Sequence, residues 1–148
     1  MTGYEKSTDY GSRPAGWRFF ALIILAWLLI GAGVIYAQAM PACSSGARIN
    51  CVVDGDTVWI DGEKIRLLNV DAPEIGQADC RAERQRGIAA RDRMVQLTTG
   101  RPEIFRQGKD RYGRTLAHVR FAGRDIGEAL IATGHARRWE GRKADWCR

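Results

Sequence analysis

The architecture follows from CVVDGDTVWIDGEKIRLLNV, residues 51–70. Three apolar segments rich in β-branched residues predict strands here, namely Ile49–Val53, Thr57–Ile60 and Lys64–Val70. Asp54-Gly55 and Asp61-Gly62 separate them, and Asp-Gly between apolar runs is a strong hairpin signal. The residues therefore predict a three-stranded antiparallel meander, which ends at Ala72-Pro73.

Residues 81–98 predict a helix, because Arg, Glu, Ala and Gln dominate them and proline is absent. Small or apolar residues recur on one face at helical spacing: Gly87, Ala90, Met94 and Leu97. This face is expected to pack on the sheet, and Gly87 predicts a close approach to a strand. Gly100 and Pro102 are expected to close the helix.

Two more strands and a second helix follow. The strands are predicted at Glu103–Arg106 and Thr115–Phe121. Asp125 is expected to cap a helix at 126–133 that Gly134 stops. The order of three strands, a helix, two strands and a helix indicates a mainly β fold with helices (α+β). We expect a five-stranded Greek-key barrel of the OB type with two packed helices.

One N-terminal hydrophobic helix is predicted before this domain. Residues 1–18 are polar and mixed in charge, and residues 19–37, FFALIILAWLLIGAGVIYA, are apolar throughout. A helix of that length is about 30 Å long, the thickness of a bilayer core. Lys6, Arg13 and Arg18 precede it, so the N-terminus is expected to stay in the cytoplasm while the rest of the chain leaves it.

Two interpretations of this segment stay open. The first, which we prefer, is an uncleaved transmembrane anchor that makes the chain a single-pass membrane protein. The second is a signal peptide cut after Ala37-Gln38-Ala39, which would release a secreted protein. In both, a linker at 38–47 leads to one domain at 48–148 on the extracytoplasmic side, in the periplasm or at the cell surface.

Composition limits the classes of function. Of the 148 residues, 45% are hydrophobic and 27% charged, which is typical of a globular protein. Only two residues are His, which argues against a His-rich or Cys/His metal site. The four Cys suit disulfides formed outside the cytosol. Lys and Arg outnumber Asp and Glu by 23 to 17, and the excess is nearly all Arg, which favours a polyanionic partner.

Three carboxylates carry the first chemical signal. Asp56 begins a strand, where Asp is disfavoured, and Asp71 and Glu74 follow the third strand. The hairpin would bring them close together, and such a group suggests a hard cation such as Ca²⁺. Asp54, by contrast, is explained by the turn. Arg66 can join this group only if the strand bends, because strict alternation places Arg66 and Asp71 on opposite faces.

Three motifs in a fixed order are more specific than any one of them. They are DGDT at 54–57, RLLNVDAPE at 66–74 and DRYGRTLA at 110–117. Together they resemble the staphylococcal nuclease (thermonuclease) family, over about residues 52–136. The resemblance implies an OB-type barrel that cleaves DNA and RNA and uses Ca²⁺ as its cofactor. The expected partner is therefore a DNA or RNA substrate, and we expect the chain to be monomeric.

The resemblance also implies three sets of site residues, carried over by position. The calcium ligands would be Asp56, Asp71 and the backbone carbonyl of Ala72. The catalytic residues would be Arg66, Glu74 and Arg114, with Glu74 as the general base. The residues that contact the substrate phosphate would be Arg111 and Tyr112. Phosphodiester hydrolysis builds negative charge on phosphate oxygens, so a cation and two guanidinium groups suit this chemistry.

The C-terminal tail, residues 137–148, departs from the family. It is basic and stands where the family has its last long helix. Four Cys allow three pairings. We expect Cys147 to tie the tail to Cys80, which leaves Cys43 with Cys51.

Two rival functions come from other classes of protein. One is a non-catalytic OB module, anchored at the membrane, that binds nucleic acid or a protein. The other is an envelope scaffold without metal dependence or salt-sensitive DNA binding. A non-catalytic relative should have lost acidic or arginine residues of the site. This chain keeps five such residues, which favours the enzyme: Asp56, Arg66, Asp71, Glu74 and Arg114.

Overall fold

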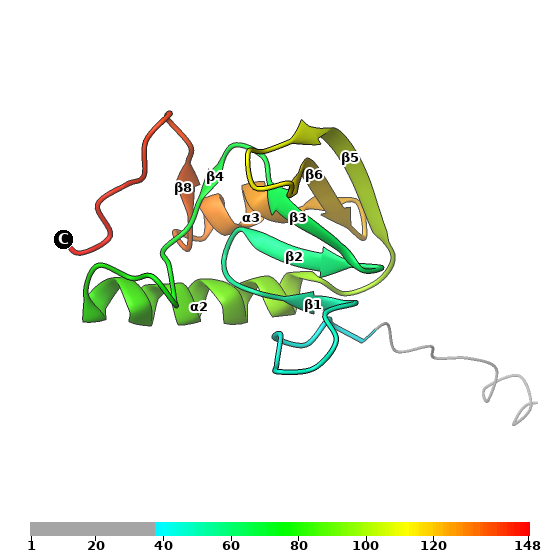
Figure 1. The fold of residues 1–148 in the computed structure, drawn as a ribbon, viewed down its shortest axis with the longest axis horizontal. Coiled ribbons are helices and arrows are strands. Elements are labelled where there is room, and N and C mark those ends of the chain that lie inside the picture. The colour runs from blue at the N-terminus through cyan, green and yellow to red at the C-terminus, as the bar shows by residue number, and fades with distance from the viewer. Residues whose placement is uncertain (1–37) are drawn as a thin grey trace, which may run out of the picture. The chain divides into compact units, whose positions relative to one another are not determined.

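The computed structural model describes residues 38–148 (Figure 1). The polar segment 1–18 and the hydrophobic helix predicted at 19–37 lie outside the described residues. Within 38–148, no helix is both long and apolar enough to cross a membrane.

The predicted meander is present. β1 (Cys51–Val52), β2 (Thr57–Ile60) and β3 (Glu63–Leu67) pair antiparallel in sequence order. The turn between β2 and β3 has positive φ at both central residues, 50° at Asp61 and 79° at Gly62. This backbone is typical of a two-residue hairpin turn. The Asp-Gly signal therefore identified both the turn and the pairing of the strands that flank it.

The third strand is shorter than predicted, and this difference shapes the site. The sequence predicts one continuous strand, but the chain turns at Asn69, whose φ is 59°. Asparagine tolerates this left-handed backbone better than most residues. The chain then forms β4 (Val70–Asp71), which leaves the main sheet and pairs with β8 (Arg137–Arg138). The structure thus contains the bend that Arg66 needs in order to share a site with β4.

A second hairpin completes the main sheet. β5 (Pro102–Lys109) pairs with β6 (Thr115–Phe121), and β6 lies parallel to β3. The strand order is β1-β2-β3-β6-β5, with β7 (Arg124–Asp125) beside β6. This order is the Greek-key arrangement of an OB-type fold. β5 is longer than the predicted strand because it continues past a bulge at Gly108, and it begins with the proline expected to close the preceding helix.

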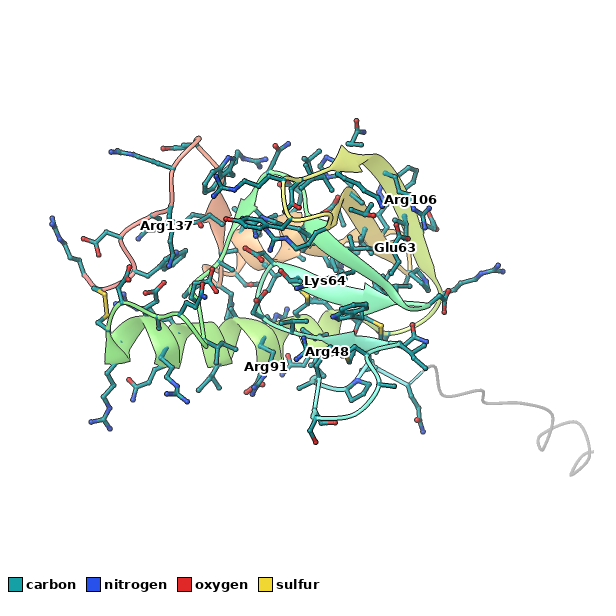
Figure 2. All side chains as sticks on the ribbon, in the orientation of Figure 1. Arg48, Glu63, Lys64, Arg91, Arg106 and Arg137 are labelled. Atoms are coloured by element: carbon teal, nitrogen blue, oxygen red, sulfur yellow. A yellow bond between two sulfur atoms is a disulfide. The ribbon has the colours of Figure 1, made fainter. Side chains whose placement is uncertain are left out.

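Glu63 of β3 ties the second hairpin to the meander. Arg106 of β5 donates to the Glu63 carboxylate at 2.6 Å, and the Thr115 hydroxyl of β6 donates to it at 2.6 Å. Figure 2 shows Glu63 and Arg106 lying next to each other. The hydrogen bond from Arg106, with help from Thr115, holds the pKa of Glu63 below its ordinary value. These contacts fix the hairpin whose turn contributes to the site described below.

Two helices pack on the sheet, and Figure 1 shows the longer one running along one side of it. α2 (Arg81–Leu97) buries the four residues predicted for its inner face, and also Glu83. Its first turn is capped by Cys80, whose Sγ accepts from the Glu83 N–H. α3 (Ile126–Ala132) has the predicted cap, Asp125.

The core lies between the strands and these helices. Its members come from β1, β2, β3, β6 and both helices, among them Val52, Val58, Ile60, Ile65, Leu67, Met94, Ala117, Val119, Ile126 and Leu130. Burial of each such side chain contributes about 1.5–3 kcal/mol relative to exposure. This core holds the strand ends and turns that carry the site.

Two disulfides link the periphery to this core. They join Cys43 to Cys51 and Cys80 to Cys147, which is the pairing expected above. The first disulfide accompanies backbone pairing: the Cys43 N–H donates to the Val52 carbonyl at 2.8 Å. Part of the segment expected to be a linker is therefore attached to β1.

Candidate active site

A cleft of about 730 Å³ opens where the β3–β4 bend, the β5–β6 turn and the C-terminal tail meet. Six of the eight residues implied by the family resemblance line it: Arg66, Asp71, Glu74, Arg111, Tyr112 and Arg114. The other two are buried: Asp56 is 6% exposed and Ala72 is 4% exposed. Asp56 is nevertheless connected to the cleft, because it pairs with Arg66.

Arg66 links two strands of the meander and spans the bend. Its guanidinium forms an ion pair with Asp56 and donates to the Val70 carbonyl at 3.3 Å. Asp56 also accepts from the Thr57 hydroxyl at 2.8 Å. Burial alone would lower the pKa of Arg66, but Asp56 and two nearby carboxylates outweigh it, so the pKa is raised. The guanidinium therefore stays charged in a partly buried position.

Asp54 lies beside the candidate site, although its place in a turn is enough to explain it from the sequence alone. Burial and the charge of Asp56, followed by a smaller effect of Glu74, raise the pKa of Asp54 to about 7. Burial and Asp56 likewise raise the pKa of Glu74, against the opposing charges of Lys143 and Arg66. Three carboxylates thus repel one another here. The available signal was a second Asp two positions before Asp56.

Helix α2 determines where Glu74 lies. A side-chain carbon at Gly87 would lie 2.7 Å from the Glu74 carbonyl oxygen and 2.8 Å from that of Pro73. The close approach predicted at Gly87 is therefore real, but its neighbour is the segment after β4 and not a strand. The Glu74 N–H also donates to the buried carboxylate of Glu83 at 3.2 Å. Two residues of one helix thus hold the backbone of the implied general base.

The β5–β6 turn carries the remaining basic groups. Asp110 accepts from Arg114 Nε at 2.7 Å and from the backbone N–H groups of Tyr112 and Arg114, each at 2.9 Å. The guanidinium carbons of Arg111 and Arg114 lie 4.8 and 5.5 Å from the centre of the Tyr112 ring. Tyr112 itself is 68% exposed. Two guanidinium groups and a phenol therefore stand at the cleft, which suits contact with phosphate.

The C-terminal tail reaches the implied metal ligand Asp71, a contact that the sequence analysis did not assign. Asp71 Oδ2 accepts from the Ala144 N–H at 2.9 Å and from Trp146 Nε1 at 3.1 Å. Lys143 lines the cleft, and its ammonium lies 2.8 Å from Glu83 Oε1. Trp146 is buried in the tail, and its indole N–H reaches the site.

The oxygen atoms at the cleft suit a hard cation. Repulsion among the carboxylates of Asp54, Asp56 and Glu74 indicates an excess of negative charge. The implied ligands Asp56, Asp71 and the Ala72 carbonyl all offer oxygen. Within residues 38–148, no three His, Cys, Asp or Glu side chains are gathered into a metal cage. Arg66 pairs with Asp56 there, and the tail binds Asp71. The chemistry of the donors and the unbalanced charge fit a divalent cation.

The fold and the cleft together define a class, an OB-type domain with arginines and carboxylates around one site. The staphylococcal nuclease homologue family matches residues 64–145. A thermonuclease of Staphylococcus intermedius is 31% identical over 124 residues, which cover 79% of this chain and 74% of that protein. A thermonuclease of Staphylococcus hyicus is 35% identical over 130 residues, 78% of this chain and 77% of that protein. The chain belongs to the staphylococcal nuclease family.

A further relative is not named as a nuclease. The succinoglycan biosynthesis protein ExoI of Rhizobium meliloti (strain 1021) is 38% identical over 94 residues, 57% of this chain and 48% of that protein. This chain thus spans about half the length of that relative. Family membership defines the fold and the class of the domain, and the activity of this chain is argued from its own residues.

Proposed function

We propose that this chain is a Ca²⁺-dependent nuclease that hydrolyses phosphodiester bonds of DNA, RNA or both. The observation that carries the proposal is the cleft itself, which unites Arg66, Glu74 and Arg114 beside buried carboxylates. The names of the relatives support it, because they include thermonucleases and a micrococcal nuclease of Shigella flexneri.

The two arginines stabilise charge on the phosphate. Attack on a phosphodiester places additional negative charge on the non-bridging oxygens as the transition state forms. Arg66 and Arg114 can each donate two parallel N–H groups to such oxygens, and both are held by carboxylates, Asp56 and Asp110, at the cleft wall. Arg111 and Tyr112 on the exposed turn contact the neighbouring phosphate and position the strand.

Glu74 removes a proton from the attacking water. Burial and the nearby charge of Asp56 raise the pKa of Glu74, which makes the carboxylate a stronger base than an exposed one. Asp56, Asp71 and the Ala72 carbonyl would hold Ca²⁺, which supplies charge stabilisation and orders water when bound. α2 keeps Glu74 in place through Glu83.

We also propose that the domain acts outside the cytoplasm. Two disulfides support this location, because such links persist in oxidising compartments. The apolar segment 19–37, with basic residues before it, supports export through an anchor or a signal peptide.

The test is cleavage by the full-length, oxidised protein. Single- and double-stranded DNA and RNA are incubated with Ca²⁺, with Mg²⁺ and with chelator. Wild type is compared with Glu74→Gln and Arg114→Ala, and with Glu103→Gln and Arg124→Ala as controls at exposed positions on β5 and β7. We expect Ca²⁺-dependent cleavage that falls by about 100-fold or more in the two site variants only.

The rival binding module predicts a different result. A folded wild type that binds DNA, with an affinity that falls as salt rises, but cuts no substrate under any metal would overturn the enzyme. Cleavage that is equal in wild type and in Glu74→Gln would place the activity elsewhere.

A further inference from the structure

We propose that the C-terminal tail positions Asp71 for metal binding, with Trp146 as the positioning residue and the Cys80–Cys147 disulfide as its anchor. The inference rests on the proposed function, in which Asp71 is a metal ligand. The family match ends at residue 145, so Trp146 and Cys147 lie beyond the matched segment.

Two donors from the tail converge on one oxygen of Asp71. The backbone N–H of Ala144 and the indole N–H of Trp146 both donate to Oδ2, at 2.9 and 3.1 Å. Asp71 is 3% exposed and Trp146 is 6% exposed, so water competes little for these bonds. Two donors on Oδ2 fix the rotation of the carboxylate and leave the lone pairs of Oδ1 for another partner. Hydrogen bonds of this kind orient the ligands of metal sites and tune their affinity.

Contacts along the tail hold Trp146 itself. The Arg137 guanidinium carbon lies 4.6 Å from the centre of the Trp146 ring. Arg86 of α2 donates to the Trp146 carbonyl. Three residues earlier, Lys143 pairs with the buried Glu83 at 2.8 Å. These contacts therefore hold both the face of the Trp146 ring and the backbone of the tail around it, as a positioning residue requires.

The disulfide explains how an irregular segment can serve as a rigid support. Residues 139–148 contain no helix or strand, so ordering them costs conformational freedom. The Cys80–Cys147 bond closes a loop with a sequence separation of 67 and removes much of that freedom from the unfolded chain. It also joins the residue after Trp146 to the residue that caps α2. The helix that holds Glu74 and the tail that holds Asp71 are thus covalently connected.

The first experiment removes one N–H. Trp146→Phe keeps an aromatic ring against Arg137 and deletes the donor to Asp71. Trp59→Phe is the matched control, because the indole N–H of Trp59 is buried and has no acceptor within residues 38–148. Ca²⁺ binding to the full-length, oxidised protein is measured by calorimetry, and cleavage is followed over a Ca²⁺ titration.

We expect Trp146→Phe to weaken Ca²⁺ binding by about 10-fold or more and Trp59→Phe to leave it unchanged. Saturating Ca²⁺ should restore most of the cleavage rate in Trp146→Phe, because the change disorients a ligand without removing it. Circular dichroism in chelator checks that the variant is folded before Ca²⁺ is added, because Ca²⁺ binding would also stabilise a partly unfolded variant.

The second experiment removes the Cys80–Cys147 disulfide. Cys80→Ser/Cys147→Ser is compared with Cys43→Ser/Cys51→Ser, which deletes the other disulfide, beside β1. Both are measured well below their unfolding temperatures. We expect Cys80→Ser/Cys147→Ser to lose Ca²⁺ affinity and Cys43→Ser/Cys51→Ser to keep it. If Trp146→Phe does not fold, this comparison tests whether the tail positions Asp71.

The outcomes separate this inference from the proposed function. If wild type binds Ca²⁺ and cleaves, and Trp146→Phe and Cys80→Ser/Cys147→Ser match it in both respects, the tail does not position Asp71 and the nuclease stands. If wild type neither binds Ca²⁺ nor cleaves, the proposed function is wrong and this inference falls with it.

Discussion

Arg66 makes two contacts with one guanidinium group: it pairs with Asp56 and spans the bend to Val70. An ammonium group at this position would keep the charge, but it would lack the planar fork that grips a carboxylate and a phosphate together. On the proposed function, the shape of this group therefore matters as well as its charge.

Arg66→Lys should lower kcat for cleavage by about 100- to 1,000-fold at saturating Ca²⁺, the usual effect of losing one donor to a developing oxyanion. Arg91→Lys is the control, because Arg91 lies on α2 and pairs with its neighbour Asp92 at 2.8 Å. Initial rates over a range of substrate concentrations check the prediction. Equal rates in wild type and Arg66→Lys would mean that charge alone suffices at this position.

Asp54→Asn tests the repulsion among the carboxylates of Asp54, Asp56 and Glu74. At about pH 8, above the pKa of Asp54, removing one of three like charges should raise the free energy of unfolding in chelator by about 1 kcal/mol or more. It should also reduce the additional stability that Ca²⁺ confers, because less charge is left to neutralise. Urea unfolding with and without Ca²⁺ measures both effects. Asp92→Asn, at an exposed position on α2, should change neither.

Motif resemblance selected charged residues that the structure brings to one cleft, but it selected neither Asp54 nor the residues that support them. Asp56, Arg66 and Arg114 stand in short motifs whose order is informative without a structure. Asp54 was not predicted as a site residue because its place in a turn was enough to explain it. The role of Trp146 was not predicted because its hydrogen bond to Asp71 joins residues 75 apart in sequence. Local periodicity in a sequence does not indicate such a contact.

At the scale of elements, α2 is the support for the implied general base. Its Gly87 lies against the backbone of Pro73 and Glu74, and its Glu83 accepts from the Glu74 N–H. The packing of α2 on the domain therefore also sets the position of Glu74.

Gly87→Ala should lower the free energy of unfolding by about 1–3 kcal/mol, because the new methyl group would meet backbone carbonyl oxygens that cannot rotate away. It should also reduce cleavage, since the collision falls on Glu74. Gly46→Ala is the control, because a side-chain carbon there meets nothing within 4 Å. Chemical denaturation and cleavage rates measure the two effects. A Gly87→Ala variant as stable and active as wild type would show that the helix can shift freely.

The Glu83–Lys143 pair should make stability depend on pH. Burial raises the pKa of Glu83, but the hydrogen bonds from Lys143 and from the N–H groups of Asp79 and Glu74 outweigh it, so the net pKa is lowered. A lowered carboxyl pKa contributes stability that is present above the ordinary value and is lost as pH falls through the folded value. Glu83→Gln should therefore destabilise the protein at pH 7, by about 1–3 kcal/mol, and by much less near pH 3.

Urea unfolding at the two pH values tests this prediction. Glu128→Gln is the control, because Glu128 pairs with Arg138 at the exposed surface and should have a much smaller effect. A difference between wild type and Glu83→Gln that stays constant from pH 7 to pH 3 would contradict the assigned ionisation.

Elements with local signals were predicted well, and elements formed by distant partners were not. Asp61-Gly62 and the Asp125 cap specify their turn and helix start through their own backbone and side chain. β8 consists of two exposed arginines without strand periodicity, and it exists because β4 lies beside it. β4 in turn depends on the left-handed residue Asn69, which the apolar run around it concealed.

At the scale of the whole domain, the order of elements was enough to predict the path of the main sheet. Each hairpin is local, so within residues 38–148 the long-range pairing of the main sheet that the order had to imply is the parallel contact of β3 with β6. An OB-type arrangement supplies that contact. The cellular compartment of the domain stays a prediction from sequence, because the apolar segment 19–37 lies outside the described residues.

Cell fractionation tests the anchor against the signal peptide. An uncleaved anchor predicts the full 16.5 kDa chain in the membrane fraction, released by detergent and not by salt. Cleavage after Ala39 predicts a shorter, soluble form outside the cytoplasm. A full-length chain that is soluble in the cytoplasm, with four reduced cysteines, would contradict both.

The exposed turn at Arg111 and Tyr112 is a natural point of attack for proteases, because loop tips are where chains are most readily cut. This turn lies between Cys80 and Cys147 in the sequence. A single cut there leaves two fragments that remain joined through their sulfur atoms. The nicked protein therefore keeps its mass on a non-reducing gel and separates only when a reductant is added.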